Sequence, residues 1–281
     1  MMQTYRDRIL VETEYVGANV SCIVTAKGLV LVDSPFLPPD ARDWAEKIKA
    51  ETGKEIAYLI NTDHHYDHVM GNTYLTENTI CHEAAARGMN YLKDKKALKD
   101  IIKGSFPDVV TNFKSDIDTL NIVSPHISFK KQMTLNMGDA TINLEFAGGH
   151  SPGTILIHFE EEKTVFTGDN VEGQFPFLGQ ARFKPWRDTL DKILSMDIDL
   201  VVPGHGPVGG KEMVEKYMVF FRRLEDEVRE MNEKRMSVDQ MAEESELITF
   251  FPTEDNSTEA VHRSWIKNQY KYAVNVILQE L

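Results

Sequence analysis

A segment rich in histidine and aspartate, residues 61–68, holds the side chains best suited to chemistry in this chain. It packs five potential metal ligands into six positions: Asp63, His64, His65, Asp67 and His68. The segment directly follows the apolar run at 56–60, and many α/β enzymes present ligands where a buried strand ends. We therefore predict a metal site here, rather than a polar turn that is merely rich in histidine.

Three later turns each carry one further ligand next to a predicted strand. Their sequences are Gly148-Gly149-His150, Thr167-Gly168-Asp169 and Pro203-Gly204-His205. Glycine allows such a turn to bend tightly and lets another backbone approach closely. One turn of this kind is weak evidence, but four ligand-rich turns indicate one metal centre. Imidazole and carboxylate ligands suit Zn, Fe or Mn and exclude an all-thiolate site.

This ordered set of motifs resembles the metallo-β-lactamase-fold superfamily over residues 15–210. The family motif His-x-His-x-Asp-His matches residues 63–68 at every ligand position except the first. The later single ligands of the family match three residues in the same order: His150, Asp169 and His205. An earlier strand that ends in Asp33 matches the family's aspartate that supports a metal ligand.

The resemblance implies two adjacent metal sites. The first would use Asp63, His65 and His150. The second would use Asp67, His68 and His205. Asp169 would bridge the two. Two zinc ions are the expected cofactors, and Fe or Mn are alternatives. Two metals about 3.5–4 Å apart can clamp the oxygens of a hydrolytic transition state.

Asp63 departs from the family pattern, because it replaces an imidazole with a shorter, anionic carboxylate. Its carboxylate can bind metal and bias the site toward Mn or Fe. It can instead fall short of the metal and leave a single ion at the second site. Or His64 can substitute, although on an extended backbone its side chain should point to the opposite face. We expect a dinuclear site with Asp63 as a ligand; His64 either supports a neighbouring ligand or faces solvent.

The resemblance also implies a metal-dependent hydrolase. A metal-bound hydroxide would attack an ester, thioester, lactone, amide or phosphoester of a small molecule, and Asp67 would act in catalysis by orienting the nucleophile and relaying a proton. Two alternatives stay open. One is an iron-dependent redox enzyme of the same fold, similar to sulfur dioxygenases, and the other is a noncatalytic binding protein with a degenerate site. The sequence does not identify the substrate.

The elements that must position these residues follow from hydrophobic periodicity. It predicts strands over residues 11–16, 20–25, 29–33, 56–60, 127–135, 140–146, 154–159, 164–166 and 200–202. It predicts helices over residues 38–52, 186–196, 211–231 and 259–281, and Ser237 to Gln240 form a capping box that starts another short helix. Together with the resemblance, this pattern predicts a four-layer αββα sandwich of two mixed β-sheets.

We expect one metallo-β-lactamase-like domain over residues 1–210 and a helical C-terminal extension over 211–281, packed on the same domain. Residues 84–124 would form an inserted helical flap, either a mobile lid or a plain solvated layer. The extension would either cover the pocket or form a homodimer contact. The aromatic and cationic segment 172–187 would be either a wall for an anionic substrate or a well-packed loop.

Composition limits the partners and the compartment. A formal net charge of −13 argues against a nucleic-acid binder, which needs a basic surface. No apolar run reaches membrane-spanning length, and the first residues lack the apolar core of a signal peptide. Cys22 and Cys81 are expected to be reduced core thiols. A cytoplasmic enzyme with a small-molecule substrate is the resulting expectation.

Overall fold

The structure is a computed structural model that describes residues 2–105, 117–118, 120, 122–251 and 259–280. The chain forms two compact units. Unit 1 comprises Met1–Phe146 and Gly153–Phe166, and unit 2 comprises Ala147–Pro152 and Thr167–Leu281. Both units contain residues that the sequence predicts to be metal ligands.

Unit 1 contains a seven-stranded sheet with the order β1-β2-β3-β4-β5-β6-β7. The strands are β1 (Gln3–Tyr5), β2 (Ile9–Glu12), β3 (Val20–Thr25), β4 (Gly28–Val32), β5 (Ile56–Ile60), β6 (Thr79–His82) and β7 (Ile127–Phe129). Neighbours are antiparallel from β1 to β4 and parallel from β4 to β7. Parallel pairing brings the carboxyl ends of β4, β5 and β6 to one edge of the sheet, and the 61–68 segment begins at this edge.

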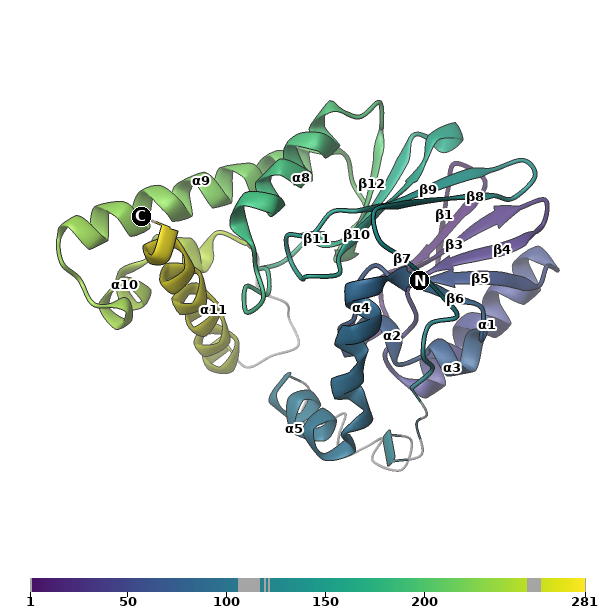
Figure 1. Ribbon diagram of the computed structural model, residues 1–281, viewed down its shortest axis with the longest axis horizontal. Coiled ribbons are helices and arrows are strands. Elements are labelled where there is room, and N and C mark those ends of the chain that lie inside the picture. Colours follow the sequence, from purple (N-terminus) through teal and green to yellow (C-terminus); the bar gives the residue numbers. More distant parts are fainter. Residues whose placement is uncertain (1, 106–116, 119, 121, 252–258, 281) are drawn as a thin grey trace. The chain divides into compact units, whose positions relative to one another are not determined.

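Helix α1 (Pro38–Thr52) connects β4 to the parallel strand β5 (Figure 1). Proline is tolerated in the first turn, where the missing N–H would have no helical partner, and the helix ends at Gly53, whose φ is 67°. Trp44 and Ile48 are fully buried and join apolar residues of β3, β4 and β5. This confirms the predicted helix, and these two side chains face the core.

A five-stranded sheet has the order β12-β11-β10-β9-β8. Its strands are β8 (Gln132–Asn136), β9 (Thr141–Phe146), β10 (Ile155–Phe159), β11 (Thr164–Glu172) and β12 (Leu200–His205). The neighbours from β8 to β11 are antiparallel. Strand β11 runs through the boundary between the units. The predicted fold class, an α/β protein with two mixed sheets, is confirmed.

Several predicted strand bounds were wrong. The strand expected at 11–16 is β2, which already ends at Glu12. The Glu12 carboxylate accepts the backbone N–H groups of Thr13 and Glu14, so these groups are not available for sheet pairing. The strand expected at 127–135 divides into β7 and β8, which belong to different sheets. The strands expected at 164–166 and 200–202 continue to Glu172 and His205. Asp169 and His205 therefore lie within strands rather than after them.

Most of the described part of the predicted flap is helical and contributes to the core of unit 1. It comprises α4 (Glu83–Gly88), the 3₁₀ helix η1 (Met89–Lys93) and α5 (Lys95–Ser105). Leu92, Leu98 and Ile102 are fully buried in one apolar cluster. Residues 106–116, 119 and 121 of the predicted flap lie outside the described residues, and its behaviour as a mobile lid stays a prediction.

Unit 2 contains the helices α8 (Phe183–Ser195), α9 (Lys211–Glu233), α10 (Val238–Glu244) and α11 (Glu259–Glu280), shown in green and yellow in Figure 1. Aromatic packing joins α8 to α9: the ring centroids of Trp186 and Phe221 are 4.9 Å apart. The capping box is present, because Ser237 Oγ accepts from the Gln240 N–H and the Gln240 side chain accepts from the Ser237 N–H. The assignment of residues 211–281 as an extension of one domain stays a prediction.

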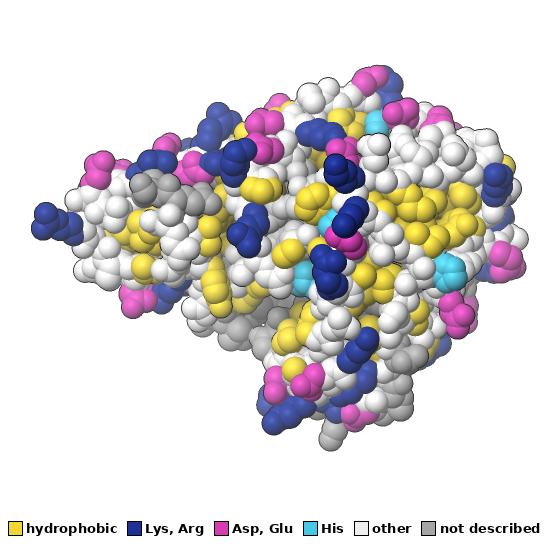
Figure 2. Space-filling view, in the orientation of Figure 1, with side chains coloured by type: hydrophobic (Ala, Val, Ile, Leu, Met, Phe, Trp, Pro, Cys, Tyr) yellow, Lys and Arg dark blue, Asp and Glu magenta, His cyan; other side chains and the backbone are white. Residues whose placement is uncertain are grey.

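The surface carries charges of both signs. On the face shown in Figure 2, lysine and arginine side chains are interspersed with aspartate and glutamate side chains. Among the residues that the structure describes, no helix combines the length and the apolar character needed to cross a bilayer.

Candidate metal centre

Asp33 anchors the segment that follows β5. It lies directly after β4 with a φ of 58°, a left-handed conformation that is uncommon outside glycine. Its two carboxylate oxygens accept from Thr62, one from the backbone N–H at 2.8 Å and the other from the hydroxyl at 2.7 Å. Because β4 and β5 are parallel neighbours, their ends meet at these contacts. Asp33 thereby fixes the chain immediately before Asp63.

The same carboxylate also holds a predicted ligand. His68 Nδ1 lies 2.9 Å from Asp33 Oδ2, and both side chains are buried. A carboxylate at Nδ1 favours a proton there and keeps Nε2 as the ligand atom. Complete burial raises the pKa of the Asp33 carboxyl, and the contacts with His68 and Thr62 oppose that rise. Asp33 therefore takes the supporting position that its strand-end motif predicts.

Asp67 and His68 lie on the short helix α2 (Tyr66–Val69). His68 Nε2 and Asp67 Oδ2 are 3.9 Å apart, so the two predicted ligands lie beside each other. Gly17 makes room for Asp67: its φ is 99°, and a Cβ there would lie 3.1 Å from the Asp67 Cβ. The structure thus places these two residues at the same end of the sheet as Asp33.

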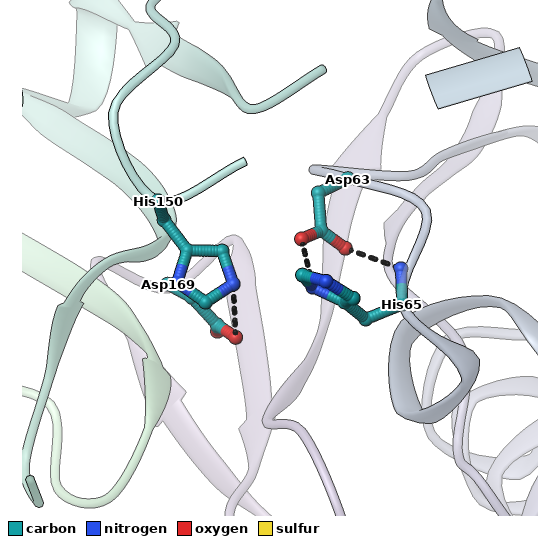
Figure 3. Close-up of side chains that lie close together, drawn as sticks. All are labelled: Asp63, His65, His150 and Asp169. Atoms are coloured by element: carbon teal, nitrogen blue, oxygen red, sulfur yellow. Dashed lines mark hydrogen bonds and ion pairs between the residues drawn. The ribbon is translucent and has the colours of Figure 1, made fainter. Parts of the chain in front are cut away.

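Asp63 is fully buried and its carboxylate is turned onto His65 (Figure 3). Asp63 Oδ1 accepts the His65 backbone N–H at 2.8 Å, and Oδ2 lies 2.6 Å from His65 Nδ1. The substituted position of the motif is therefore engaged with the next ligand along the chain. A carboxylate has enough lone pairs to hold this histidine and bind a metal as well.

His64 packs inside unit 1, so of its two expected alternatives the solvent-facing one was wrong. It is 5% exposed, and its ring centroid lies 4.7 Å from that of His65 and 6.3 Å from that of Tyr91. Gly88 permits this packing, because a Cβ there would lie 2.4 Å from the His64 ring. Burial lowers the pKa of His64 to about 4, which keeps the imidazole neutral at physiological pH.

In unit 2, Asn170 clamps the turn that presents His150. Its side chain accepts the His150 backbone N–H at 3.0 Å and donates to the Gly148 carbonyl at 2.9 Å. Gly149 has a φ of 98°, and a Cβ there would lie 2.6 Å from Asn170 Oδ1. The His150 ring meets the Trp186 ring edge-on, with centroids 5.7 Å apart. Backbone and ring are both fixed, as a metal ligand requires.

Asp169 lies between two imidazoles. Its Oδ2 is 3.4 Å from His150 Nε2, and its Oδ1 is 3.5 Å from His205 Nε2. Figure 3 shows the first of these contacts. Gly204 leaves the necessary space, because a Cβ there would lie 1.9 Å from Asp169 Oδ1. Each oxygen of this carboxylate thus faces a different predicted ligand, as a bridging carboxylate should.

Sequence reasoning missed Glu172. It is the last residue of β11 and is 4% exposed. Potential ligand atoms of Asp169, Glu172 and His205 all lie within 4.8 Å of one another. The Glu172 Oε2 atom accepts from the Gln174 side chain at 3.3 Å. The available signal was a carboxylate in a long buried strand, but the strand was expected to end at residue 166.

The predicted ligands thus fall into two groups. Unit 1 holds Asp63, His65, Asp67 and His68. Unit 2 holds His150, Asp169 and His205. These residue types suit a metal ion, and their oxygen and nitrogen donors fit Zn, Fe or Mn. Thiolates do not contribute, because both cysteines are buried and burial raises the pKa of Cys81 to about 12. Assignment of all seven residues to one centre stays a prediction.

The segment 172–187 is mainly packed. Trp186 is fully buried and its Nε1 donates to the Asn170 carbonyl at 2.9 Å. Two of the three lysine and arginine side chains in this segment make ion pairs: Lys184 with Asp188 at 2.8 Å, and Arg187 with Glu225. For Trp186 the packing alternative is therefore correct.

Comparison with known proteins identifies the relationship. The family model described as "Metallo-beta-lactamase superfamily" matches residues 14–205. Among curated proteins, the chain is 25% identical over 75% of its length to "Beta-lactamase-like protein 2 homolog" of Caenorhabditis elegans. It is 24% identical over 58% of its length to "Acyl-coenzyme A thioesterase MBLAC2" of Homo sapiens. These alignments span 64% and 61% of the two relatives, less than two thirds of their length.

A bacterial relative is covered more fully. The chain is 24% identical to "Metallo-beta-lactamase type 2" of Bacillus sp. (strain 170), with 72% of this chain and 71% of the relative aligned.

Solved structures show the same fold at low sequence identity. A metallo-beta-lactamase from Pontibacter korlensis matches with a TM-score of 0.61 and 16% identity, over 79% of this chain and 98% of that chain. The sec-alkylsulfatase Pisa1 from Pseudomonas sp. matches with a TM-score of 0.75 and 14% identity, over 98% of this chain and 50% of that chain.

Proposed function

The chain belongs to the metallo-beta-lactamase superfamily, and from this membership we propose that it is a metal-dependent hydrolase of a small molecule. One observation carries the proposal. The two oxygens of Asp169 face Nε2 atoms of two different histidines, His150 and His205, at 3.4 and 3.5 Å. A buried carboxylate in this position is suited to hold two cations, or one cation with several ligands.

The proposed ligand set is that of the family with one substitution. In this proposal, the first site would use Asp63, His65 and His150. The second site would use Asp67, His68 and His205. Asp169 would be shared. Zinc is the expected metal because imidazole is the commonest donor in the set, and the carboxylates admit Mn or Fe.

When bound, the metal lowers the pKa of water toward about 7 and polarises the bond to be cleaved. The residues of the chain orient the ligand atoms and handle the proton. Asp33 holds Nδ1 of His68 and thereby directs Nε2. Asp67 lies beside His68 and is partly exposed, so it can accept a proton from the attacking water and pass it to the leaving group.

The substrate class comes from the relatives. One of them is named a thioesterase and another a β-lactamase, and both names denote cleavage of an acyl bond. We therefore propose acyl substrates. Thioesters and esters are the first candidates, and lactones and amides are the next. Phosphoesters, which are not acyl compounds, come last. The fold likeness to a sulfatase adds sulfate esters to the compounds worth assaying.

The test combines metal analysis with a substrate panel. Protein expressed in defined medium is expected to contain one or two equivalents of metal and to hydrolyse at least one acyl substrate. Chelation should abolish hydrolysis, and added metal should restore it. The His205→Gln variant should lose activity, whereas the matched control His158→Gln should keep it, since His158 lies on β10 outside the proposed set.

Two results would overturn the hydrolase proposal. Hydrolysis that persists in fully metal-free protein would exclude metal-dependent catalysis. Iron-loaded protein with substrate-linked oxygen uptake and no hydrolysis would favour the redox alternative instead.

A further inference from the structure

Glu172 is a buried carboxylate that the family ligand set does not include. It is 4% exposed and ends a strand in which all nine residues are buried. An ionised carboxylate is removed from water only at a large cost unless a positive charge or several hydrogen bonds compensate. The Gln174 side chain donates to its Oε2 at 3.3 Å, and a nearby cation would compensate its charge further.

Close approach of the ends of β11 and β12 brings Glu172 to the proposed ligands. The Gly173 N–H donates to the His205 carbonyl at 2.8 Å. A Cβ at Gly173 would lie 2.9 Å from Pro207 Cδ and 3.2 Å from Gly206 Cα. Because the ends of β11 and β12 are this close, potential ligand atoms of Glu172, Asp169 and His205 fall within 4.8 Å of one another.

The surroundings concentrate negative charge. Asp169 and Glu172 are both buried carboxylates, and like charges at this separation repel. The fully buried hydroxyl of Tyr217 accepts the Glu172 backbone N–H at 3.1 Å. Burial raises the pKa of Tyr217, and the charges of Glu172 and Asp169 raise it further, so the phenol stays neutral. A bound cation would relieve the repulsion between the carboxylates.

We propose that Glu172 is an additional carboxylate of the metal centre, acting on the ion held by Asp169 and His205. The inference rests on the proposed function, because it requires that these two residues bind metal. Carboxylate oxygen suits Mn²⁺ more than it suits Zn²⁺, which imidazole serves well. Glu172 therefore raises the affinity for Mn²⁺ by a larger factor than it raises the affinity for Zn²⁺.

The experiment measures the dissociation constants of Mn²⁺ and Zn²⁺ in the full-length metal-free protein. Free Mn²⁺ is followed by electron paramagnetic resonance, and Zn²⁺ by competition with a chromophoric chelator. The variants are wild type, Glu172→Gln and the control Glu233→Gln, which changes an exposed glutamate on α9. Circular dichroism and thermal melting of each metal-free protein confirm folding.

The Glu172→Gln variant is expected to bind Mn²⁺ about tenfold more weakly or worse, with a smaller loss for Zn²⁺. The Glu233→Gln control should match wild type for both metals. If Glu172→Gln fails to fold, Glu172→Asp replaces it, and its shorter side chain should also weaken Mn²⁺ binding selectively.

Wild-type affinity for both metals in a folded Glu172 variant would overturn the inference and leave the proposed function standing. Equal losses of affinity for both metals would overturn the claim that Glu172 favours Mn²⁺ over Zn²⁺. A wild-type protein that binds neither metal would overturn the proposed function itself, and with it this inference.

Discussion

Asp63 Oδ2 lies 2.6 Å from His65 Nδ1, while Asp63 Oδ1 accepts the His65 backbone N–H at 2.8 Å. The Asp63 carboxylate thus fixes both the backbone and the ring of His65. A carboxylate at Nδ1 favours the tautomer with its proton on Nδ1 and leaves Nε2 available to a metal. In the proposed centre, Asp63 therefore orients His65 in addition to any bond that it makes to metal.

The Asp63→Asn variant tests this relationship. An amide offers one oxygen, so it can accept only one of the two His65 donors and carries no charge. We expect metal affinity at the first site to fall about tenfold or more, with the second site little changed. Isothermal titration with Zn²⁺ should show the loss as a weakened binding event.

The Asp191→Asn variant is the control for this charge change, since Asp191 is exposed on α8. Two unchanged binding events in Asp63→Asn would contradict both the ligand role and the orienting role of Asp63.

The Asp33→Asn variant should damage the second site through His68. If its amide nitrogen replaces Oδ2, it faces both the His68 Nδ1–H and the Thr62 hydroxyl, which now donate to Asp33 at 2.9 and 2.7 Å; if it replaces Oδ1, it faces the Thr62 backbone N–H. His68 would then shift its proton to Nε2 and lose the lone pair that binds metal. We expect metal affinity to fall about 10–100-fold and stability by about 2 kcal/mol.

The Thr62→Val variant separates stability from tautomer control. It removes the hydroxyl that donates to Asp33 Oδ2 but leaves the Asp33–His68 contact in place. A loss of about 1 kcal/mol in chemical denaturation is expected, with metal affinity nearly that of wild type. Equal metal affinities in Asp33→Asn and wild type would refute the tautomer argument.

The sequence predicted the elements and the strongest ligand motif because both are local patterns. The helix over Pro38–Thr52 and the strand over Ile56–Ile60 are marked by proline, periodicity and apolar runs. The 61–68 segment stands out because its ligands are close in sequence. Asp33 was found through its match to the family's strand-end aspartate, and the structure shows the contact with His68 that this match implied.

Other features depend on tertiary contacts and could not be predicted. Strand β11 continues through Gly168-Asp169-Asn170, which is a turn sequence locally, because it pairs with β10 and β12 on its two sides. Residues three apart on a regular strand point to opposite faces, so the approach of Glu172 to Asp169 has no sequence signal. The inward packing of His64 depends on Gly88, 24 positions later in the printed sequence.

Gly204→Ala should disable the shared carboxylate and displace the β11 backbone beside it. The new Cβ would lie 1.9 Å from Asp169 Oδ1 and 2.8 Å from the Asp169 backbone nitrogen, so both the carboxylate and the strand must move. We expect loss of metal binding, measured as metal content after gel filtration. The control is Gly53→Ala, which meets nothing within 4 Å but has a φ of 67°. It should lose about 1 kcal/mol of stability from backbone strain and keep its metal. Full metal content in Gly204→Ala would contradict the assignment of Asp169.

Stability at mildly acidic pH should depend on His82, which lies outside the proposed ligand set. Its Nδ1 accepts the Ala84 N–H at the start of α4, Nε2 lies 2.8 Å from the Lys130 carbonyl, and its ring stacks on Phe146. Burial lowers the pKa of His82 below its ordinary value of 6.5, although the Lys130 carbonyl opposes the shift. The unfolded chain therefore takes up the His82 proton at a higher pH than the folded chain does.

It follows that the stability contributed by neutral His82 is fully present above pH 6.5 and is lost as the pH falls below that value. Urea unfolding of the metal-free protein between pH 7.5 and 5, with chelator present, should show a shallower pH dependence for His82→Gln than for wild type. The Ala84 N–H loses its cap in this variant, so a constant loss of about 1 kcal/mol at every pH is also expected. The pH slope carries the prediction: parallel curves for the two proteins would show that His82 has the same pKa in the folded and unfolded chains.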